Sequence, residues 1–179
     1  SSALDGIQVL DLTNQRGELA GRILADLGAS VLKIEPREGT ASRHLPPFDS
    51  EGRSLYWACY GAGKESLVLD LEDGRDRARF FDLVDHADVL IESFDPGVTD
   101  RLDLDHDRLL DRNPALIYMA ITPFGRQGPK ASWPATDLTM EAAGGRISLQ
   151  GDADRPPLPV GFPQPSLHAG AQAAADIII

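Results

Sequence analysis

The spacing of apolar residues switches between the strand and helix periods along the first 35 residues, and this constrains the fold more than any other feature. Residues 7–12 read as a strand, residues 18–27 carry apolar side chains at helical spacing, and residues 30–34 form a second short apolar strand. Gly28 stands where a glycine commonly ends a helix. Two strands joined by a helix form a βαβ unit, for which the parallel arrangement is natural.

The same alternation continues along the rest of the chain. The remaining expected strands are 66–71, 88–92 and 115–122, and the remaining expected helices are 74–86, 102–112, 137–143 and 166–179. The sequence therefore predicts one α/β domain over residues 1–179, with an open, Rossmann-like, mainly parallel sheet and helices on both faces. Residues 36–63 and 123–134 break the pattern with Pro and Gly, and long irregular stretches of this kind are usually functional.

Composition excludes several classes of protein. No apolar run approaches the ~18 residues of a membrane span, and residues 1–6 lack the pattern of a signal peptide. The single cysteine, Cys59, cannot form an internal disulfide or a cysteine-built zinc site, and the four histidines show no metal-ligand spacing, so we expect no metal site. We therefore expect a cytoplasmic protein without a membrane partner.

The net charge of −11 is unevenly distributed. The segment from Asp70 to Arg112 holds 14 acidic and 6 basic residues, a local charge of −8. Such a surface repels the phosphates of nucleic acids and anionic lipids, so we expect no nucleic-acid partner. A solvated face that keeps the protein soluble is the simpler interpretation of this segment.

Residues 173–179 stop within a helical pattern, without a C-cap glycine and with three isoleucines at the end. We interpret the chain as part of a longer protein, or as one piece of a split one. An intact mass of 19.3 kDa from the native source would contradict this interpretation.

Short segments in a fixed order connect the chain to a known family. They are residues 4–11, 24–29, 33–36, 63–66, 69–71, 87–97, 113–114 and 124–129, followed by Asp137. This ordered set resembles the family III CoA-transferases, which include formyl-CoA transferase, carnitine CoA-transferase and α-methylacyl-CoA racemase. The resemblance implies that the chain is the first half of the family's large domain. It also implies that subunits interlock, as a homodimer or as a heteromer with a related subunit.

The resemblance implies a reaction as well. In the family an aspartate carboxylate attacks the acyl-CoA thioester, and CoA then passes through an aspartyl-CoA thioester to an acceptor acid. Acyl-CoA and a carboxylic acid would be the substrates, and no tightly bound cofactor is implied. Racemase relatives instead use a histidine and an aspartate as an acid/base pair.

Five residues match positions that the family places near CoA: Gln15, Arg37, Arg43, Lys64 and Arg101. Two guanidinium groups in the loop after the second strand suit phosphate recognition, because they are planar, always charged and bidentate. The alternative for Arg37 and Arg43 is a solvated loop arginine, and the alternative for Arg101 is pairing with neighbouring aspartates.

The catalytic positions depart from the family. Ser166 stands at the position of the nucleophilic aspartate, and Thr136 at that of the racemase histidine. Ser166 is expected to be inactive as a nucleophile, because His168 points away from it on a helix, and an ordinary helix N-cap is the simpler interpretation. Asp137 would lie beside the substrate and orient it or act as a base, or else cap its own helix.

Three functions follow from the sequence. The first is a CoA-transferase, or half of one, whose nucleophilic aspartate comes from a partner subunit or a second domain. The second is a non-catalytic module of the same fold that binds or scaffolds CoA or acyl-CoA. The third, an acyl-CoA isomerase or racemase, is disfavoured by Thr136 and Ser166.

Overall fold

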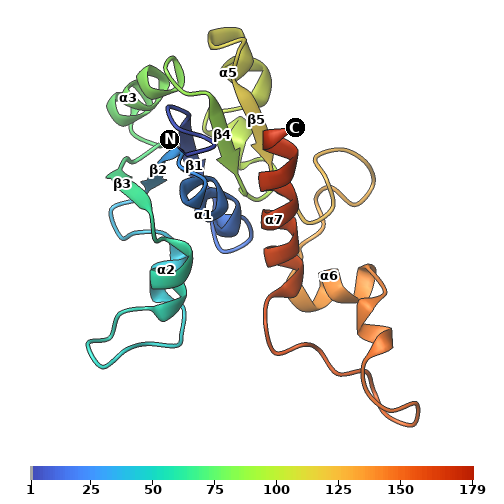
Figure 1. The fold of residues 1–179 in the computed structure, drawn as a ribbon. Helices are drawn as coiled ribbons and strands as arrows, with labels where there is room; N and C mark the ends of the chain where they lie inside the picture. Colours follow the sequence, from blue (N-terminus) through green and yellow to red (C-terminus); the bar gives the residue numbers. More distant parts are fainter. Residues whose placement is uncertain (1) are drawn as a thin grey trace.

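Five strands form one sheet in the order β3-β2-β1-β4-β5, and every pair of neighbouring strands is parallel (Figure 1). The computed structural model describes residues 2–179. The strands are β1 (Gln8–Leu12), β2 (Ser30–Glu35), β3 (Lys64–Val68), β4 (Val89–Glu92) and β5 (Ile117–Ala120). The predicted α/β class and its Rossmann-like parallel sheet are confirmed.

Helices cover both faces of the sheet, as expected. They are α1 (Glu18–Asp26), α2 (Leu55–Tyr60), α3 (Gly74–Val84), α4 (Val98–Arg101), α5 (His106–Arg112), α6 (Asp137–Ala143) and α7 (Gln164–Ile178), with 3₁₀ turns η1 (Ala41–His44) and η2 (Arg146–Leu149). Helices α1 and α7 lie side by side on one face (Figure 1). Phe80 of α3 and Leu109 of α5 are buried in the core cluster of the opposite face. Each large apolar side chain buried in this way contributes about 1.5–3 kcal/mol.

Strand β1 is the topological switch point of the sheet. Its neighbours are β2, the next strand in the chain, on one side and β4 on the other, so the strand order reverses its direction at β1. In open parallel sheets the crevice for a ligand lies beyond the carboxyl ends of the strands at such a point. The loops after β1 and β4 are therefore the first place to look for a site.

Three boundaries differ from the expected ones. Strand β3 covers residues 64–68 rather than 66–71, because its pairing with β2 begins at Lys64. The helix expected at 102–112 begins only at His106, as α5, because Asp103 adopts a positive φ of 61°, and the short helix α4 precedes this break. The stretch 36–63 is not wholly irregular, because Ser54 caps α2 by accepting a hydrogen bond from the Trp57 N–H at 3.1 Å.

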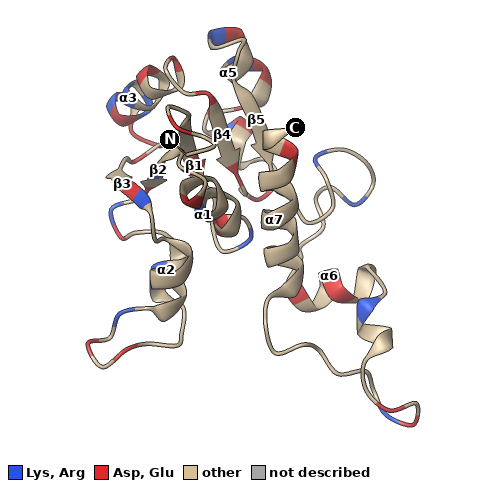
Figure 2. Cartoon of the chain, viewed as in Figure 1, with Lys and Arg blue, Asp and Glu red and all other residues tan. Residues whose placement is uncertain are grey.

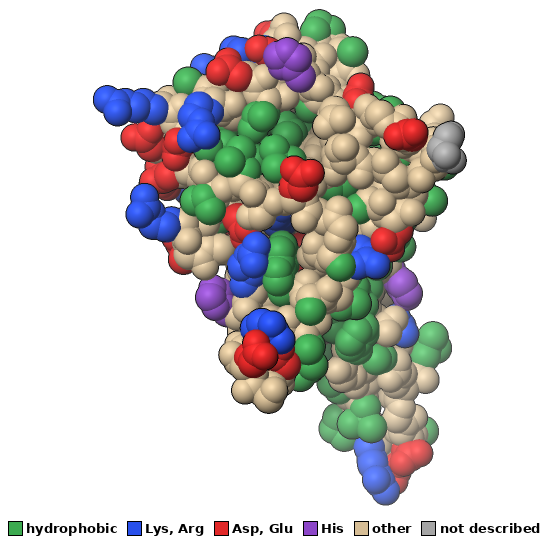
Figure 3. Space-filling view, turned by 60° about the vertical axis from the view of Figure 1, so that its left-hand side comes forward, with side chains coloured by type: hydrophobic (Ala, Val, Ile, Leu, Met, Phe, Trp, Pro, Cys, Tyr) green, Lys and Arg blue, Asp and Glu red, His purple; other side chains and the backbone are tan. Residues whose placement is uncertain are grey.

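Two segments extend away from the sheet on either side of α1 (Figure 1). We call residues 36–63 the α2 arm and residues 123–163 the α6 arm. Both arms carry acidic and basic side chains, and charged side chains of both signs are also interspersed over α3 and α5 (Figure 2). On the face seen in Figure 3, charged side chains of both signs surround a hydrophobic area.

No helix within residues 2–179 is long and apolar enough to cross a membrane. Across the same residues, the His, Cys, Asp and Glu side chains form no group of three or more that could hold a metal ion.

Candidate active site

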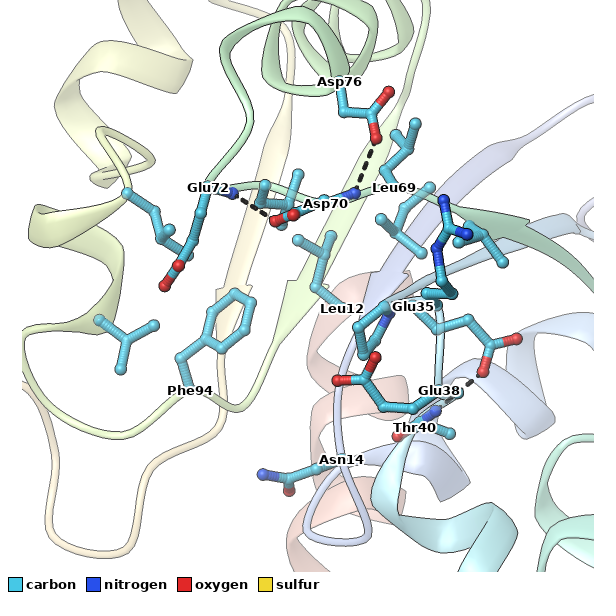
Figure 4. A pocket seen from close by; sticks show the side chains of 18 of the residues that line it. Leu12, Asn14, Glu35, Glu38, Thr40, Leu69, Asp70, Glu72, Asp76 and Phe94 are labelled. Carbon is cyan, nitrogen blue, oxygen red and sulfur yellow. Dashed lines mark hydrogen bonds between the residues drawn. The ribbon is translucent and has the colours of Figure 1, made fainter.

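A cleft of about 640 Å³ lies beyond the carboxyl ends of β1 to β4 (Figure 4). Its walls come from the loops that follow these strands and from α4. Leu12, Ile34, Leu69 and Phe94 give it apolar surface. This is the edge at which open parallel sheets hold their ligands.

Two arginines face the cleft, and they differ in their partners. Arg101 of α4 forms an ion pair with Glu72, which lies on the loop after β3. Arg37, on the loop after β2, is exposed and makes no ion pair within residues 2–179. Arg37 is therefore the cation of the cleft that is available to an anionic ligand.

The carboxylates of the cleft are largely engaged by the protein itself. Asp70 accepts a hydrogen bond from the Glu72 N–H, and Asp76 accepts one from the Asp70 N–H, both at 3.0 Å (Figure 4). Glu35 receives the Thr40 N–H at 2.9 Å. Glu35, Asp76 and Glu72 also form ion pairs with Arg43, Arg79 and Arg101 respectively, so these three carboxylates oppose an anionic ligand less than their number suggests.

The loops after β1 and β4 are joined across the switch point. The Asn14 N–H donates to Ser93 Oγ at 2.8 Å, and Ser93 Oγ donates to Asn14 Oδ1 at 2.9 Å. Arg16 forms an ion pair with Asp95 at 2.5 Å. These contacts fix the backbone that forms the inner wall of the cleft.

Lys64 lies away from the cleft, in a buried ionic cluster that we call the Lys33 cluster: Asp11, Glu18, Lys33, Ser42 and Lys64. The Lys64 ammonium contacts Asp11 Oδ2 at 2.7 Å and the Glu18 carbonyl oxygen at 2.8 Å, and its side chain is 0% exposed. The expectation that Lys64 would contact CoA is therefore replaced by a structural role.

The pKa values of the two carboxyl groups in the Lys33 cluster shift in opposite directions. Burial alone would raise the pKa of Asp11, but the Lys33 and Lys64 ammonium groups hold it well below its usual range. Burial raises the pKa of Glu18, and this outweighs Lys33 and the hydrogen bond from Ser42. Lys33 also donates to the Thr13 carbonyl oxygen. The cluster therefore holds the start of the β1–α1 loop.

Arg43 supports the loop after β2 instead of facing the cleft. Its guanidinium binds Glu35 through two hydrogen bonds of 2.7 and 2.6 Å and stacks over Trp57, 4.1 Å from the ring centroid. Burial acts to raise the pKa of Glu35, but hydrogen bonds from Arg43, Ser66 and Thr40 lower it to about 2. This role differs from the phosphate contact expected from the sequence.

The pairing of Arg43 with Glu35 makes stability depend on pH. Glu35 has a folded-state pKa of about 2 against an ordinary value of 4.5, so its stabilising effect is present above 4.5 and is lost as pH falls through this window. We expect Arg43→Gln to lower Tm at pH 7, and the Tm difference from wild type to narrow as pH falls below 4.5, because protonated Glu35 needs no cation. Thermal unfolding followed by circular dichroism measures this. Arg75→Gln, at an exposed position, is the control, and a pH-independent difference for Arg43→Gln would contradict the expectation.

Gln15 lies outside the cleft, beside Tyr56 of the α2 arm. The Tyr56 hydroxyl donates to the Gln15 carbonyl oxygen at 3.3 Å, and the buried Gln15 Oε1 has no hydrogen-bond partner within residues 2–179. Burial raises the pKa of Tyr56, and the negative charges of Glu18 and Asp137 raise it further. Gln15 thus contacts the α2 arm and does not line the cleft.

Asp137 and Ser166 meet where α6 contacts α7. Asp137 Oδ1 accepts hydrogen bonds from the Ser166 N–H at 3.1 Å and from Ser166 Oγ at 2.9 Å. Neither residue is the N-cap of its own helix, because Thr136 caps α6 and Pro163 precedes α7. The helix-cap interpretations of Asp137 and Ser166 were wrong, and Asp137 instead caps the neighbouring helix.

The sequence reasoning missed the Lys33 cluster and the contact between Asn14 and Ser93. One signal was present: Asp11 and Lys33 are charged residues inside apolar strands, where a charge requires a partner. Their common cluster depends on β1 and β2 being neighbours, with Asp11 and Lys33 in register. The partners Glu18 and Lys64 come from other elements and carry no local signal.

Comparison with known proteins identifies the family. A family model described as CoA-transferase family III matches residues 4–179. An acetyl-CoA:oxalate CoA-transferase from Acetobacter aceti is 44% identical over 159 residues, which cover 88% of this chain and 41% of that protein. A succinyl-CoA:mesaconate CoA-transferase from Haloarcula hispanica is 40% identical, over 89% of this chain and 42% of that protein.

A solved structure agrees with this relationship. A CAIB/BAIF family protein from Brucella suis superposes with a TM-score of 0.92 at 35% identity, covering 98% of this chain and 48% of that one. The chain thus spans less than half the length of these relatives. The matched family model covers nearly every residue, and the chain belongs to CoA-transferase family III.

Proposed function

We propose that the protein transfers CoA between an acyl-CoA and a carboxylic acid, with the cleft holding the nucleotide portion of CoA. The observation that carries the proposal is Arg37, an exposed guanidinium without an ion-pair partner in residues 2–179, at the edge of a cleft with apolar walls. Phosphate groups are bound well by guanidinium, which is planar and bidentate. Family membership supplies the reaction class.

The size and the lining of the cleft fit the nucleotide portion of CoA. A cleft of about 640 Å³ lies within the usual range for small-molecule sites. The apolar side chains suit a purine ring, and Arg37 and Arg101 suit phosphates. The pantetheine arm would then lead toward Gln15 and Asp137. The proposed CoA-binding residues are therefore Gln15, Arg37 and Arg101, whereas Arg43 and Lys64 support the surrounding structure.

Calorimetric titration with CoA tests the cleft. We expect Arg37→Ala to weaken CoA binding by about ten- to a hundredfold, because a hydrogen bond to a charged group contributes about 1.5–3 kcal/mol. Arg75→Ala is the matched control, since Arg75 is exposed on α3 and lies outside the cleft lining. Unchanged affinity in Arg37→Ala would remove the cleft as the nucleotide site. Absence of CoA binding to the wild-type protein would contradict the proposed function.

A measurement of turnover distinguishes an enzyme from a non-catalytic binding module. Acetyl-CoA with oxalate and succinyl-CoA with mesaconate are the substrate pairs in the names of two relatives, and they are suitable probes. Formation of oxalyl-CoA or mesaconyl-CoA, followed by mass spectrometry, supports a transferase. CoA binding without turnover supports the alternative, a non-catalytic CoA-binding or scaffolding module, which the serine at position 166 favours.

We also propose a cytoplasmic assembly with a second subunit of the same or a related sequence. Trp133, Leu149 and Leu158 of the α6 arm are 53%, 85% and 63% exposed, and apolar side chains exposed together commonly mark a contact surface. The free thiol of Cys59 suits a reducing compartment.

A further inference from the structure

The transferase reaction needs a carboxylate that accepts the acyl group, and Ser166 cannot supply one. Its hydroxyl donates to Asp137, and the residue is 2% exposed. A serine must lose a proton to attack, and an aspartate is far too weak a base to hold that proton at neutral pH. A carboxylate attacks without losing a proton. Ser166 is therefore a partner of the nearby carboxylate and not the nucleophile.

We propose that Asp137 is the acyl-accepting nucleophile of this protein, in an inference that rests on the proposed function. Its Oδ1 is held by both the Ser166 N–H and the Ser166 hydroxyl, at 3.1 and 2.9 Å. Its Oδ2 makes no hydrogen bond within residues 2–179, and the side chain is half-buried. One carboxylate oxygen is thus fixed while the other is available to react.

A second observation points to a ligand at this junction. Glu141 is 3% exposed, and neither of its carboxylate oxygens has a hydrogen-bond partner within residues 2–179. It lies one turn after Asp137 on the same side of α6, and helical side chains lean toward the N-terminus, here toward Asp137. Buried acceptors without donors are costly in a protein interior. The amide N–H groups of a pantetheine arm are donors of the kind that Glu141 and Gln15 Oε1 lack.

The chemistry balances without a further reactant. Asp137 Oδ2 attacks the thioester carbonyl carbon, the C–S bond breaks, and CoA leaves as the thiolate, giving a mixed anhydride. The thiolate attacks Asp137 Cγ, and the donor acid leaves as its carboxylate with the bridging oxygen. The acceptor carboxylate then attacks Cγ and releases the thiolate. The thiolate finally attacks the acyl carbon of the acceptor, the bond between that carbon and the bridging oxygen breaks, and Asp137 leaves with this oxygen as the free carboxylate, giving the new acyl-CoA. Ser166 is a positioning residue that keeps Oδ1 in place.

Chemical trapping tests the assignment. The full-length protein is incubated with acetyl-CoA and hydroxylamine, which converts an anhydride or thioester of a protein carboxylate into a hydroxamate, and the modified peptide is located by mass spectrometry. We expect the hydroxamate on Asp137. Modification of another carboxylate, in this chain or in a partner subunit, or CoA binding with no modification, would overturn the assignment.

Two variants distinguish the proposed nucleophile, Asp137, from the proposed positioning residue, Ser166. Asp137→Asn keeps an oxygen that can accept from Ser166, so the fold is expected to persist, while trapping is abolished and turnover falls at least about 10⁴-fold. Ser166→Ala should still give the hydroxamate on Asp137, formed about tenfold more slowly. If Ser166→Ala instead abolishes trapping in a folded protein that binds CoA, Asp137 is not the nucleophile. Failure of CoA to bind in calorimetry would be a failure of the proposed function itself, whereas turnover with trapping elsewhere leaves that function standing.

Discussion

Lys33→Met is expected to lower the free energy of unfolding by about 3–5 kcal/mol, because it leaves the buried Glu18 carboxylate without an ion pair and Asp11 with Lys64 alone. The Lys33 ammonium lies 3.1 Å from Asp11 Oδ1 and 3.7 Å from Glu18 Oε1, and the three side chains are at most 1% exposed. A loss of this size is a large share of the stability of an ordinary domain, which is about 5–15 kcal/mol. Urea unfolding measured by circular dichroism gives the difference.

The exposed Lys130 provides a matched control for this change. Lys130→Met makes the same substitution at the surface and is expected to change stability by less than about 0.5 kcal/mol. Adding Glu18→Gln to Lys33→Met should recover part of the loss, since it removes the carboxylate that loses its ion pair, whereas Asp11 keeps Lys64. Equal effects at positions 33 and 130 would show that the cluster contributes nothing beyond a surface lysine.

Gly170→Val is expected to cost up to about 3 kcal/mol and to slow turnover about tenfold, as expected for Ser166→Ala, because α7 packs tightly against α1 at this glycine. A Cβ at position 170 would lie 3.0 Å from Leu19 Cβ and 3.2 Å from the Ala20 nitrogen, and both valine methyl groups would extend further. Ser166 is one turn earlier on α7. A displaced α7 therefore also separates Ser166 from Asp137.

A valine at the neighbouring position 169 serves as a control for the lower helix propensity of valine. Ala169 is exposed on the same helix, so Ala169→Val adds a β-branched residue without a new contact and should cost well under about 1 kcal/mol. Thermal unfolding and the acetyl-CoA turnover assay measure both variants. Full activity in Gly170→Val would mean that the spacing of α1 and α7 does not set the position of Ser166.

Local periodicity was enough to predict most of the fold, because each β-α-β step is encoded by nearby residues. It predicted α6 at Asp137–Ala143 and α1 to within one residue. It failed for α2, a six-residue helix of sequence LYWACY, in which no polar face alternates with an apolar one to give a helical pattern. The bounds of β3 also depended on β2, a partner that lies about 30 residues earlier.

The site was less predictable because side-chain roles depend on partners distant in sequence. Arg37 and Arg101 do face the cleft, and both were named from the sequence. Arg43 and Lys64 were named on the same grounds, yet Glu35 and Asp11 engage them. The sequence alone does not distinguish an arginine or lysine that is free to bind a phosphate from one that forms an ion pair with a carboxylate of the same protein.

The parallel pairing of β1 with β4 has a consequence for synthesis on the ribosome. Val9 is in register with Val89, so one edge of the central strand finds its neighbour only after some 80 further residues have been made. Until then β1 can pair with β2 alone, and its other edge is open to wrong partners, a hazard of slowly formed, non-local sheets. The acidic stretch from Asp70 to Arg112 is translated across the arrival of β4. Like charges in this stretch repel one another, which opposes association of chains whose β1 edge is still unpaired.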